Sequence, residues 1–263
     1  MDDNAITPVG LALGSLMLLI PLAILLWTRT GLVRETLLAL VRMIVQLLFV
    51  GLYLGWIFQI NNPLLNIFWL LVMASVADGT ILRRSGLRLR RLAADLFAAL
   101  VIGVVPPLVI FVTLILSVDD PLHARFMIPV GGMVLGNCLR ANVVGLRSFF
   151  QSIRQREKSY LYMLAAGASQ WEALRPFLRE SLREAFSPTI ATIATVGLVS
   201  LPGMMTGVIL AGREPMQAIL YQIAIMMAIF TGTAATVLAA IKLTSRKAFT
   251  ADGLLRRDIF TPV

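Results

Sequence analysis

The sequence predicts an all-α polytopic membrane protein with about seven transmembrane helices, and three observations carry that prediction. Hydrophobic residues make up 58% of the 263 residues and charged residues 14%, with a mean hydropathy of +0.85. Soluble domains have an apolar fraction nearer about 45–50%. The apolar residues gather in runs long enough to cross a bilayer, and the basic residues gather between alternate runs.

A transmembrane helix needs about 20 mostly apolar residues. The first such run, from Pro8 to Trp27, is too long for the apolar core of a cleavable signal peptide. Seven segments meet the length requirement and together predict a single transmembrane domain over residues 1–263: 8–28, 38–58, 63–82, 93–117, 126–146, 188–211 and 217–241.

The basic residues predict the orientation, because Lys and Arg concentrate in the cytoplasmic loops of membrane proteins. With the N-terminus outside, 19 of the 23 Lys and Arg residues fall in inner segments, and only Arg125 and Arg213 fall in outer ones. Arg42 and Arg140 lie inside predicted spans, where we expect them to snorkel toward the interface or to pair with an acid. The prediction is N-terminus out and C-terminus in, with a cytoplasmic segment at about 147–187.

Two of the predicted spans contain helix-breaking residues. Pro106–Pro107 is expected to break the fourth span, and Leu201–Pro202–Gly203 the sixth, near its middle. A break at membrane depth is tolerated where it faces protein or a water-filled cavity, and it points to a transport site. The alternative is a structural kink. Polar oxygens and thioethers flank the second break, at Ser200, Met204 and Met205.

Several polar and small residues inside spans bear on helix packing. Asn137 and Gln222 are costly in lipid and are expected to face the interior, although Asn137 could simply form an interhelical hydrogen bond. Asp78 is close enough to Arg83 for an interfacial role. Glycines four residues apart let helices approach closely, and such pairs occur at Gly10/Gly14, Gly51/Gly55, Gly132/Gly136 and Gly203/Gly207.

The longest polar-rich passage is Tyr160 to Pro188. A helix is expected to end at Gly167, which readily takes the left-handed conformation. Ser169 and Glu172 have the spacing of a capping box, so a new helix should begin there. Pro176 is expected to end this helix after about two turns, with a third helix following. The pattern suits a docking element, or an amphipathic helix lying on the membrane surface.

The composition excludes several kinds of site. Cys138 is the only cysteine and His123 the only histidine, so an intramolecular disulfide and a multi-histidine metal cluster are excluded. No basic-aromatic groove indicates nucleic-acid binding. Clustered acids or Ser–His pairs, which an enzyme acting on lipid-linked substrates would need, are not evident. For a metal, the candidates are the thioethers of Met204 and Met205, which favour soft ions over hard ones.

Part of this passage resembles the cytoplasmic loop of ABC-transporter permeases. The matching residues are Gly167-Ala168-Ser169, then Leu178-Arg179-Glu180-Ser181 and Pro188, while Leu161 stands where many importers carry Glu. In those proteins a short coupling helix sits in a groove of the ATPase subunit. The resemblance implies that the ATPase-coupling residues are Ala166, Gly167, Ala168, Ser169, Trp171, Glu172, Arg175 and Arg179.

The chain as a whole resembles the FetB-type family of iron-export ABC-transporter permeases, whose plant relatives are linked to aluminium tolerance. The resemblance rests on Gly136-Asn137, the turn at 164–169, the block 195–207, and Pro215 with Tyr221-Gln222-Ile223. It implies a multi-pass permease homodimer in a bacterial cytoplasmic membrane. The family has also been tied to sugar nucleotides, so a UDP-sugar remains an alternative cargo. The expected translocation pathway comprises Asn137, Ser200, Pro202, Gly203, Met204, Met205, Tyr221 and Gln222.

The source of energy follows from the same resemblance and from one absence. No Gly-x-x-x-x-Gly-Lys-Ser/Thr motif occurs in the sequence. We therefore expect this chain to bind no cofactor and not to be an enzyme, with ATP and Mg²⁺ held by a separate ATPase subunit. A secondary transporter without an ATPase is the other possibility, but internal repeats, which many such transporters have, are not evident.

Overall fold

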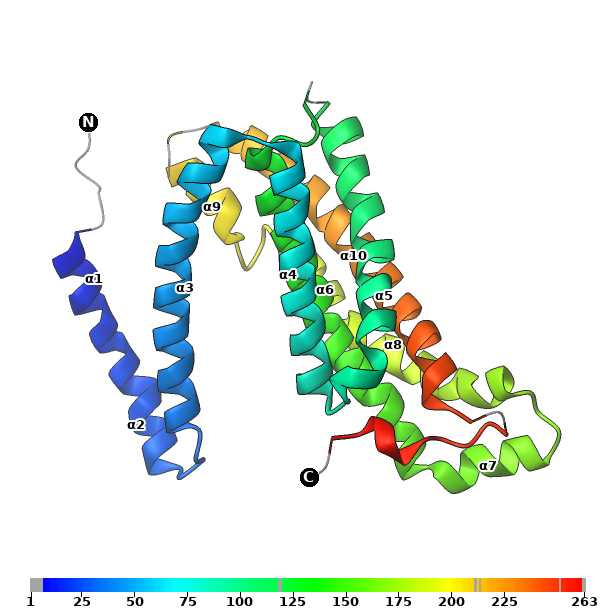
Figure 1. Ribbon diagram of the computed structural model, residues 1–263. Coiled ribbons are helices and arrows are strands. Elements are labelled where there is room, and N and C mark those ends of the chain that lie inside the picture. Colours follow the sequence, from blue (N-terminus) through cyan, green and yellow to red (C-terminus); the bar gives the residue numbers. More distant parts are fainter. Residues whose placement is uncertain (1–6, 118–119, 211, 213, 251, 262–263) are drawn as a thin grey trace. The chain divides into compact units, whose positions relative to one another are not determined.

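Helices account for nearly all of the ordered secondary structure, as the apolar periodicity requires. The computed structural model describes residues 7–117, 120–210, 212, 214–250 and 252–261 (Figure 1). Within these residues there are isolated β-bridges but no strand, so the all-α prediction is confirmed. Ala211, the end of the predicted sixth span, and Arg213, counted among the outer basic residues, lie outside the described residues.

The chain divides into two compact units, Met1–Ile60 and Asn61–Val263. In the first unit a short apolar rod is followed by a longer helix. The rod consists of α1 (Pro8–Gly14), a 3₁₀ turn (Ser15–Leu18) and α2 (Leu19–Trp27), and the longer helix is α3 (Val33–Ile60). A single permease domain over 1–263 stays a prediction.

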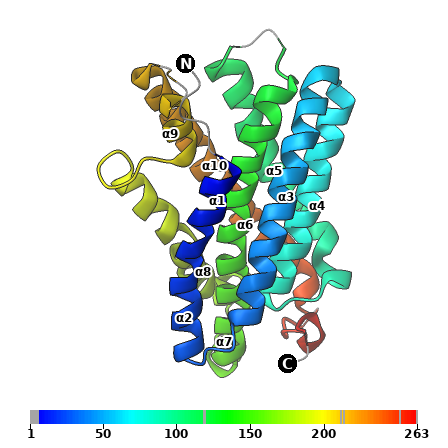
Figure 2. The same cartoon turned by 90° about the vertical axis from the view of Figure 1, so that its left-hand side faces the viewer.

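The second unit holds the remaining helices, and it contains the candidate site. Asn62 caps the first of these helices by accepting hydrogen bonds from the amides of Leu64 and Leu65. The helices are α4 (Pro63–Ser85), α5 (Leu89–Ile110), α6 (Ala124–Gln155), α7 (Glu157–Ala165), α8 (Gln170–Thr195), α9 (Gly203–Leu210) and α10 (Pro215–Ala248). Within this unit α10 packs closely on α5 and α6, and α6 packs on α4 (Figures 1 and 2).

In the described chain, six helical stretches are long and apolar enough to cross a membrane. They coincide with six of the seven predicted spans: Val9–Trp27, Val33–Ile60, Pro63–Ser85, Arg91–Ile115, Ala124–Gln155 and Pro215–Ala248. The predicted sixth span, 188–211, is instead built from the end of α8 and the short α9, with non-helical residues between them. The count of seven spans and the N-out orientation stay predictions.

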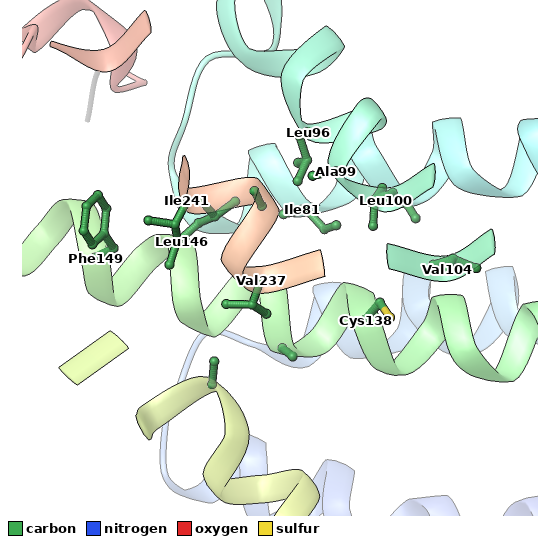
Figure 3. Close-up of a cluster of buried hydrophobic side chains, with 14 of the residues drawn as sticks. Ile81, Leu96, Ala99, Leu100, Val104, Cys138, Leu146, Phe149, Val237 and Ile241 are labelled. Atoms are coloured by element: carbon green, nitrogen blue, oxygen red, sulfur yellow. The ribbon is translucent and has the colours of Figure 1, made fainter. Parts of the chain in front are cut away.

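The core of the second unit lies where α4, α5, α6 and α10 meet. Figure 3 shows Val104, Cys138 and Val237 among its buried side chains. A Cβ atom at Gly103 would lie 2.3 Å from Thr236 Cγ2 and 2.6 Å from the Thr236 backbone nitrogen, so α5 and α10 are in backbone contact there. Close helix contact at this point thus depends on a glycine outside the pairs predicted from spacing.

The glycine pairs predicted from spacing behave differently from Gly103. A Cβ atom at Gly203 or Gly207 would have no atom of the described chain within 4 Å, so this pair makes no close helix contact within the chain. Gly132 approaches only the flexible end of Met73, at 3.1 Å. The interhelical hydrogen bond comes from Asn142, which donates to Thr236 Oγ1 at 3.0 Å, whereas Asn137 donates to the Met133 carbonyl of its own helix.

The predicted break at Pro106–Pro107 is wrong. Helix α5 continues through both prolines to Ile110, and a π-helical turn (Phe111–Ile115) follows. A proline removes one helical hydrogen bond but has a helical φ. Val104 and Leu108 are buried on either side of the prolines, so tertiary packing holds the helix together there.

The short helix predicted to end at Pro176 is also wrong. Helix α8 is one helix of 26 residues that includes both Pro176 and Pro188. Its buried face runs across the first proline from Leu174 to Phe177, so burial favours continuation. The lost hydrogen bond at Pro176 frees only a carbonyl on an exposed residue, Glu172.

After α10 the chain returns to the connection between α4 and α5 (Figure 1). The Arg88 amide donates to the Ile259 carbonyl at 2.8 Å, and the Thr261 amide donates to the Gly86 carbonyl at 3.0 Å. An ion pair between Arg91 and Asp258, at 2.8 Å, lies beside them. The C-terminal segment is therefore fixed to the same end of the bundle as α7.

Candidate functional site

The chain leaves the helical conformation between α8 and α9. Helix α8 ends at Thr195, two residues before Gly197, whose φ of +86° is left-handed. The Gly197 amide donates forward along the chain, to the Ser200 carbonyl at 2.9 Å, instead of continuing the helix. Helix α9 resumes at Gly203, directly after Pro202. The predicted interruption at Pro202–Gly203 is confirmed, and it begins earlier, at residue 196.

A cavity of about 580 Å³ lies beside this break, between α6, α8, the start of α9 and α10. Five of the predicted pathway residues line it, and they come from three separate parts of the chain: Asn137, Pro202, Gly203, Met204 and Gln222. The structure brings these residues together. Their role as a translocation pathway stays a prediction.

The polar groups of this cavity are largely unpaired within the described chain. Gln222 is 7% exposed, and its side-chain amide makes no hydrogen bond with the described residues. Asn137 donates its amide nitrogen to the Met133 carbonyl at 2.8 Å, and no described group donates to its amide oxygen. Thr192 donates its hydroxyl to the Pro188 carbonyl at 3.0 Å. Amide and hydroxyl groups with free hydrogen-bonding capacity suit a ligand that is itself polar.

A second hollow, of about 540 Å³, adjoins the other side of the break and is mostly apolar. Met205 lines this second hollow, and Gln222 lies at both. Two predicted pathway residues are placed elsewhere: Ser200 lies at the exposed tip of the break, and Tyr221 lines a separate small pocket near the end of α5. Met204 and Met205, the two metal candidates, therefore face different hollows.

The described residues contain no group of three or more His, Cys, Asp or Glu side chains that could hold a metal ion. Cys138 is fully buried and is not among the residues that line either hollow. The side-chain groups at the first cavity that could bind a metal ion are thioethers, amides and hydroxyls. Hard ions such as Fe(III) prefer charged oxygen ligands, so this set does not fit a bare hard cation.

Sequence reasoning missed several residues of the first cavity. Arg140 lines it, whereas its position in the sequence favoured snorkelling or pairing with an acid. Thr189 and Thr192 line it from α8. One signal could have pointed to Arg140, because it follows Asn137 by three residues and so shares its helical face.

The hairpin (residues 157–183), made of α7, a turn and the first part of α8, is the other candidate element. The Gly167 φ is +91°, and the Ala168 amide donates to the Met163 carbonyl at 3.0 Å, which closes α7 as predicted. The Ser169 amide donates to Glu172 Oε2 at 2.8 Å, and the Glu172 amide donates to Ser169 Oγ at 3.4 Å. The predicted capping box is therefore present.

The Ser169 hydrogen bonds lower the pKa of the Glu172 carboxyl below its ordinary value. The stabilisation that comes from a lowered carboxyl pKa is complete above the ordinary pKa and is lost as the pH falls through the lowered one. The cap is thus fully formed at neutral pH.

The hairpin has a buried side and an exposed side. Leu174 and Phe177 are buried, and Tyr160 is fully buried, with its hydroxyl donating to the Gly253 carbonyl at 2.8 Å. The predicted coupling residues lie mostly on the exposed side. Ala166, Gly167, Ser169, Trp171, Glu172, Arg175 and Arg179 are exposed, and Ala168 is half-buried.

Interactions with the rest of the second unit fix the hairpin in place. Lys242 Nζ of α10 lies 5.5 Å from the centre of the Trp171 ring. Arg156 pairs with Glu180, and its guanidinium lies 4.8 Å from the centre of the Phe177 ring. The hairpin therefore presents an ordered, exposed surface rather than a loose loop.

Six helical stretches in the described chain that are long and apolar enough to cross a membrane, with a broken helix beside a partly polar cavity, are typical of a multi-pass membrane protein. Over residues 8–249 the sequence matches the profile of a family described as "Uncharacterised protein family (UPF0014)". The chain belongs to this family.

Two bacterial relatives cover nearly the whole chain, and a plant relative covers 70% of it. The "UPF0014 membrane protein YjkA" of Bacillus subtilis is 30% identical over 95% of this chain and 98% of its own length. The "Probable iron export permease protein FetB" of Escherichia coli is 30% identical over 94% of each chain. The "Protein ALUMINUM SENSITIVE 3" of Arabidopsis thaliana is 33% identical over 70% of this chain and 66% of its own length. The resemblance to the FetB-type family is confirmed. No solved structure matches the chain.

Proposed function

We propose that this chain is the membrane-spanning permease subunit of an ABC transporter that exports a metal, with iron as the first candidate. The observation that carries the proposal is the match to FetB, which extends over 94% of both chains. A match of that extent covers the hairpin, the break and both hollows, so any transport function would use the same parts of the fold.

The exposed surface of the hairpin supports the proposal that a separate subunit supplies the energy for transport. A P-loop is absent from the sequence, so ATP and Mg²⁺ would be bound by a separate ATPase subunit. Gly167, Trp171 and Arg175 offer an exposed, ordered surface for such a subunit. Helix α8 begins at this surface and contributes Pro188, Thr189 and Thr192 to the cavity, so one element joins the docking surface to the cavity.

The break between α8 and α9 supports the proposal that two copies of the chain form a homodimer. Irregular backbone at membrane depth is tolerated only where protein or water covers it. Leu198 and Val199, at the tip of the break, are 89% and 81% exposed in the single chain. A homodimer in a bacterial cytoplasmic membrane would cover these apolar side chains, and each cavity would then lie beside the interface.

The test is a transport assay. The chain is co-expressed with its candidate ABC ATPase, both are reconstituted in vesicles, and ATP-dependent movement of Fe(II) is measured against a UDP-sugar control. The informative variant is Gly167→Arg. Its Cβ would meet no atom within 4 Å, but the φ of +91° is strained for any residue with a side chain. We expect this variant to hydrolyse ATP without moving iron, while the bundle stays folded.

The matched control is Gly31→Arg. Gly31 also has a positive φ, +73°, and open space around a Cβ, but it lies in the connection between α2 and α3. It should transport as the unmodified chain does. Normal transport by Gly167→Arg would overturn coupling through the hairpin. A stable complex that moves no iron would keep the permease and discard iron as its cargo, and the lack of any complex would overturn the ABC assignment.

A further inference from the structure

Arg140 contributes a charge to a cavity that is otherwise lined by neutral side chains. The residues described around the first cavity include no Asp, Glu, Lys or His, so its formal charge is +1. Glu184 is next to the lining residue Ala185 in the chain, but it is exposed and does not line the cavity.

Arg140 is exposed in the single chain, and its guanidinium has no partner among the described residues. It takes part in no ion pair, hydrogen bond or ring contact with the described residues, although four other basic residues of the second unit pair with acids. An unpaired arginine is costly inside a membrane, and such residues mark binding sites and pathways. A structural arginine in this environment would be expected to have an acid beside it.

The position of Arg140 directs it to the cavity. Met133, Asn137, Arg140 and Val144 follow one another at spacings of three and four residues along α6, so they share one face, and all four line the cavity. From the other walls, Thr189 and Gln222 add a hydroxyl and an amide, and neither side chain makes a hydrogen bond with the described residues. Three types of donor therefore converge on one space.

A cavity of this kind recognises an anion. A guanidinium presents five N–H donors in a planar fork, which matches the two oxygens of a carboxylate or phosphate. Where a bound ligand excludes water, the lower dielectric would strengthen this attraction, and it would equally strengthen the repulsion of a bare cation. The thioethers of Met204 and Met226 add soft, apolar walls rather than the charged oxygen ligands that a hard cation prefers.

We infer that the cargo carries an oxyanion group, a carboxylate or a phosphate, and that Arg140 binds this group in the cavity. The inference rests on the proposed function, since it names the cargo of the same permease. It reconciles a metal-exporting relative with a positive cavity, because a metal would travel as an anionic complex with an oxygen-rich ligand rather than as a free ion.

The test measures binding by the purified full-length chain in lipid nanodiscs, without the ATPase. The probes are Fe(III)–citrate, citrate alone, inorganic phosphate, UDP-glucose and free Fe(II), each followed by titration calorimetry. We expect at least one oxyanion probe to bind and free Fe(II) not to bind. Citrate and its iron complex test the carboxylate source, and phosphate and UDP-glucose test the phosphate source.

Three variants locate the binding. Arg140→Gln should lower the affinity for the oxyanion about tenfold or more, which corresponds to the loss of a charge-assisted hydrogen bond. Arg140→Lys keeps the positive charge without the planar fork of the guanidinium, so its affinity for the oxyanion should fall less than that of Arg140→Gln. The matched control, Arg147→Gln, removes an exposed arginine seven residues further along α6 that does not line the cavity, and it should bind as the unmodified chain does. Elution on gel filtration and thermal unfolding establish that each variant is folded.

Several results would overturn the inference. If the unmodified chain binds free Fe(II) and none of the oxyanion probes, the inference is overturned, whatever the variants show. Unchanged oxyanion binding in folded Arg140→Gln, or an equal loss in Arg147→Gln, would do so as well. The outcome is separable from the proposed function: a chain that couples to its ATPase but binds no oxyanion refutes only the inference, and oxyanion binding without any ATPase complex refutes only the ABC assignment.

Discussion

Tyr160 has a particular place among the residues of the hairpin, because it ties α7 to the C-terminal segment. Its ring stands edge-on to Phe177 of α8, with the ring centres 6.3 Å apart, and its hydroxyl donates to the Gly253 carbonyl at 2.8 Å. Burial raises the pKa of this hydroxyl above its ordinary value, so it stays a hydrogen-bond donor throughout the neutral range. One side chain thus joins three segments of the second unit.

At this scale we predict that Tyr160→Phe lowers the free energy of unfolding by about 1 kcal/mol, the net value of a typical hydrogen bond. The expected fall in Tm is about 2–4 °C for a chain of this size. Thermal unfolding of the purified protein in detergent measures it.

Tyr162→Phe is the control for this substitution. Tyr162 is 76% exposed and its hydroxyl makes no hydrogen bond with the described residues, so the Tm of Tyr162→Phe should equal that of the unmodified chain. Equal Tm values for the two variants would show that the bond to Gly253 contributes nothing to stability.

At the scale of the elements, the contact between α5 and α10 leaves no room for a side chain at Gly103. A side chain at Gly103 would overlap the backbone of Thr236, and backbone cannot move aside as the end of a flexible side chain can. A Cβ at Gly232 of α10 would in turn lie 2.9 Å from Val134 Cγ1 and 3.3 Å from the Gly103 carbonyl. These two glycines bring three helices together.

The corresponding prediction is that Gly103→Ala destabilises the protein by about 1–3 kcal/mol, the usual cost of overpacking. Thermal unfolding again provides the measurement. Gly136→Ala, in the interior of α6, is the control, since its Cβ would meet no atom within 4 Å and alanine favours a helix by about 1 kcal/mol over glycine. A Gly103→Ala variant as stable as Gly136→Ala would contradict the close contact.

The elements also show where sequence patterns succeed and fail. Six of the seven spans predicted from the apolar runs coincide with long apolar helices in the described chain, because length and hydropathy are local properties. The prolines were less informative: α5 and α8 continue through theirs, and the chain breaks where Gly197 takes a left-handed φ before Pro202. A proline removes one hydrogen bond, and whether the helix ends there depends on the packing on either side, which the local sequence does not contain.

The same reasoning applies to the site. Asn137, Pro202 and Gln222 were predictable because a polar or helix-breaking residue is unusual in an apolar span. Arg140 could have been found only by extending the helical face of Asn137. Thr189 was not predictable, because which face of a helix lines a cavity is decided by helices that are distant in sequence. The capping box at Ser169 was predictable in full, since all its partners lie within four residues.

The whole molecule has an orientation that the charge distribution predicts and that its cysteine content makes easy to test. Cys138 is fully buried, so a membrane-impermeant maleimide should label the unmodified chain weakly. Single cysteines introduced at exposed positions can then report which side of the membrane they occupy.

We predict that Met216→Cys, at the start of α10, is labelled in intact spheroplasts, and that Tyr162→Cys, in α7, is labelled only after permeabilisation. Met216 is 59% exposed and Tyr162 is 76% exposed, so both are accessible to reagent. Labelling yield by mass shift on gels is the measurement, with the unmodified chain as the background. The reverse pattern would place the hairpin outside and remove it from the reach of any cytoplasmic ATPase.

The continuity of α8 has a mechanical consequence. At 26 residues the helix is about 39 Å long, and its two prolines leave it unbroken. If such a helix tilts about its midpoint as a rigid body, its two ends move in opposite directions. A tilt of about 10° about its midpoint would carry each end through about 3 Å, roughly the width of a hydrogen bond. Movement on that scale at Thr192 is enough to make or break a contact with a ligand in the cavity, and two separate helices joined by a hinge at Pro176 would have absorbed it instead.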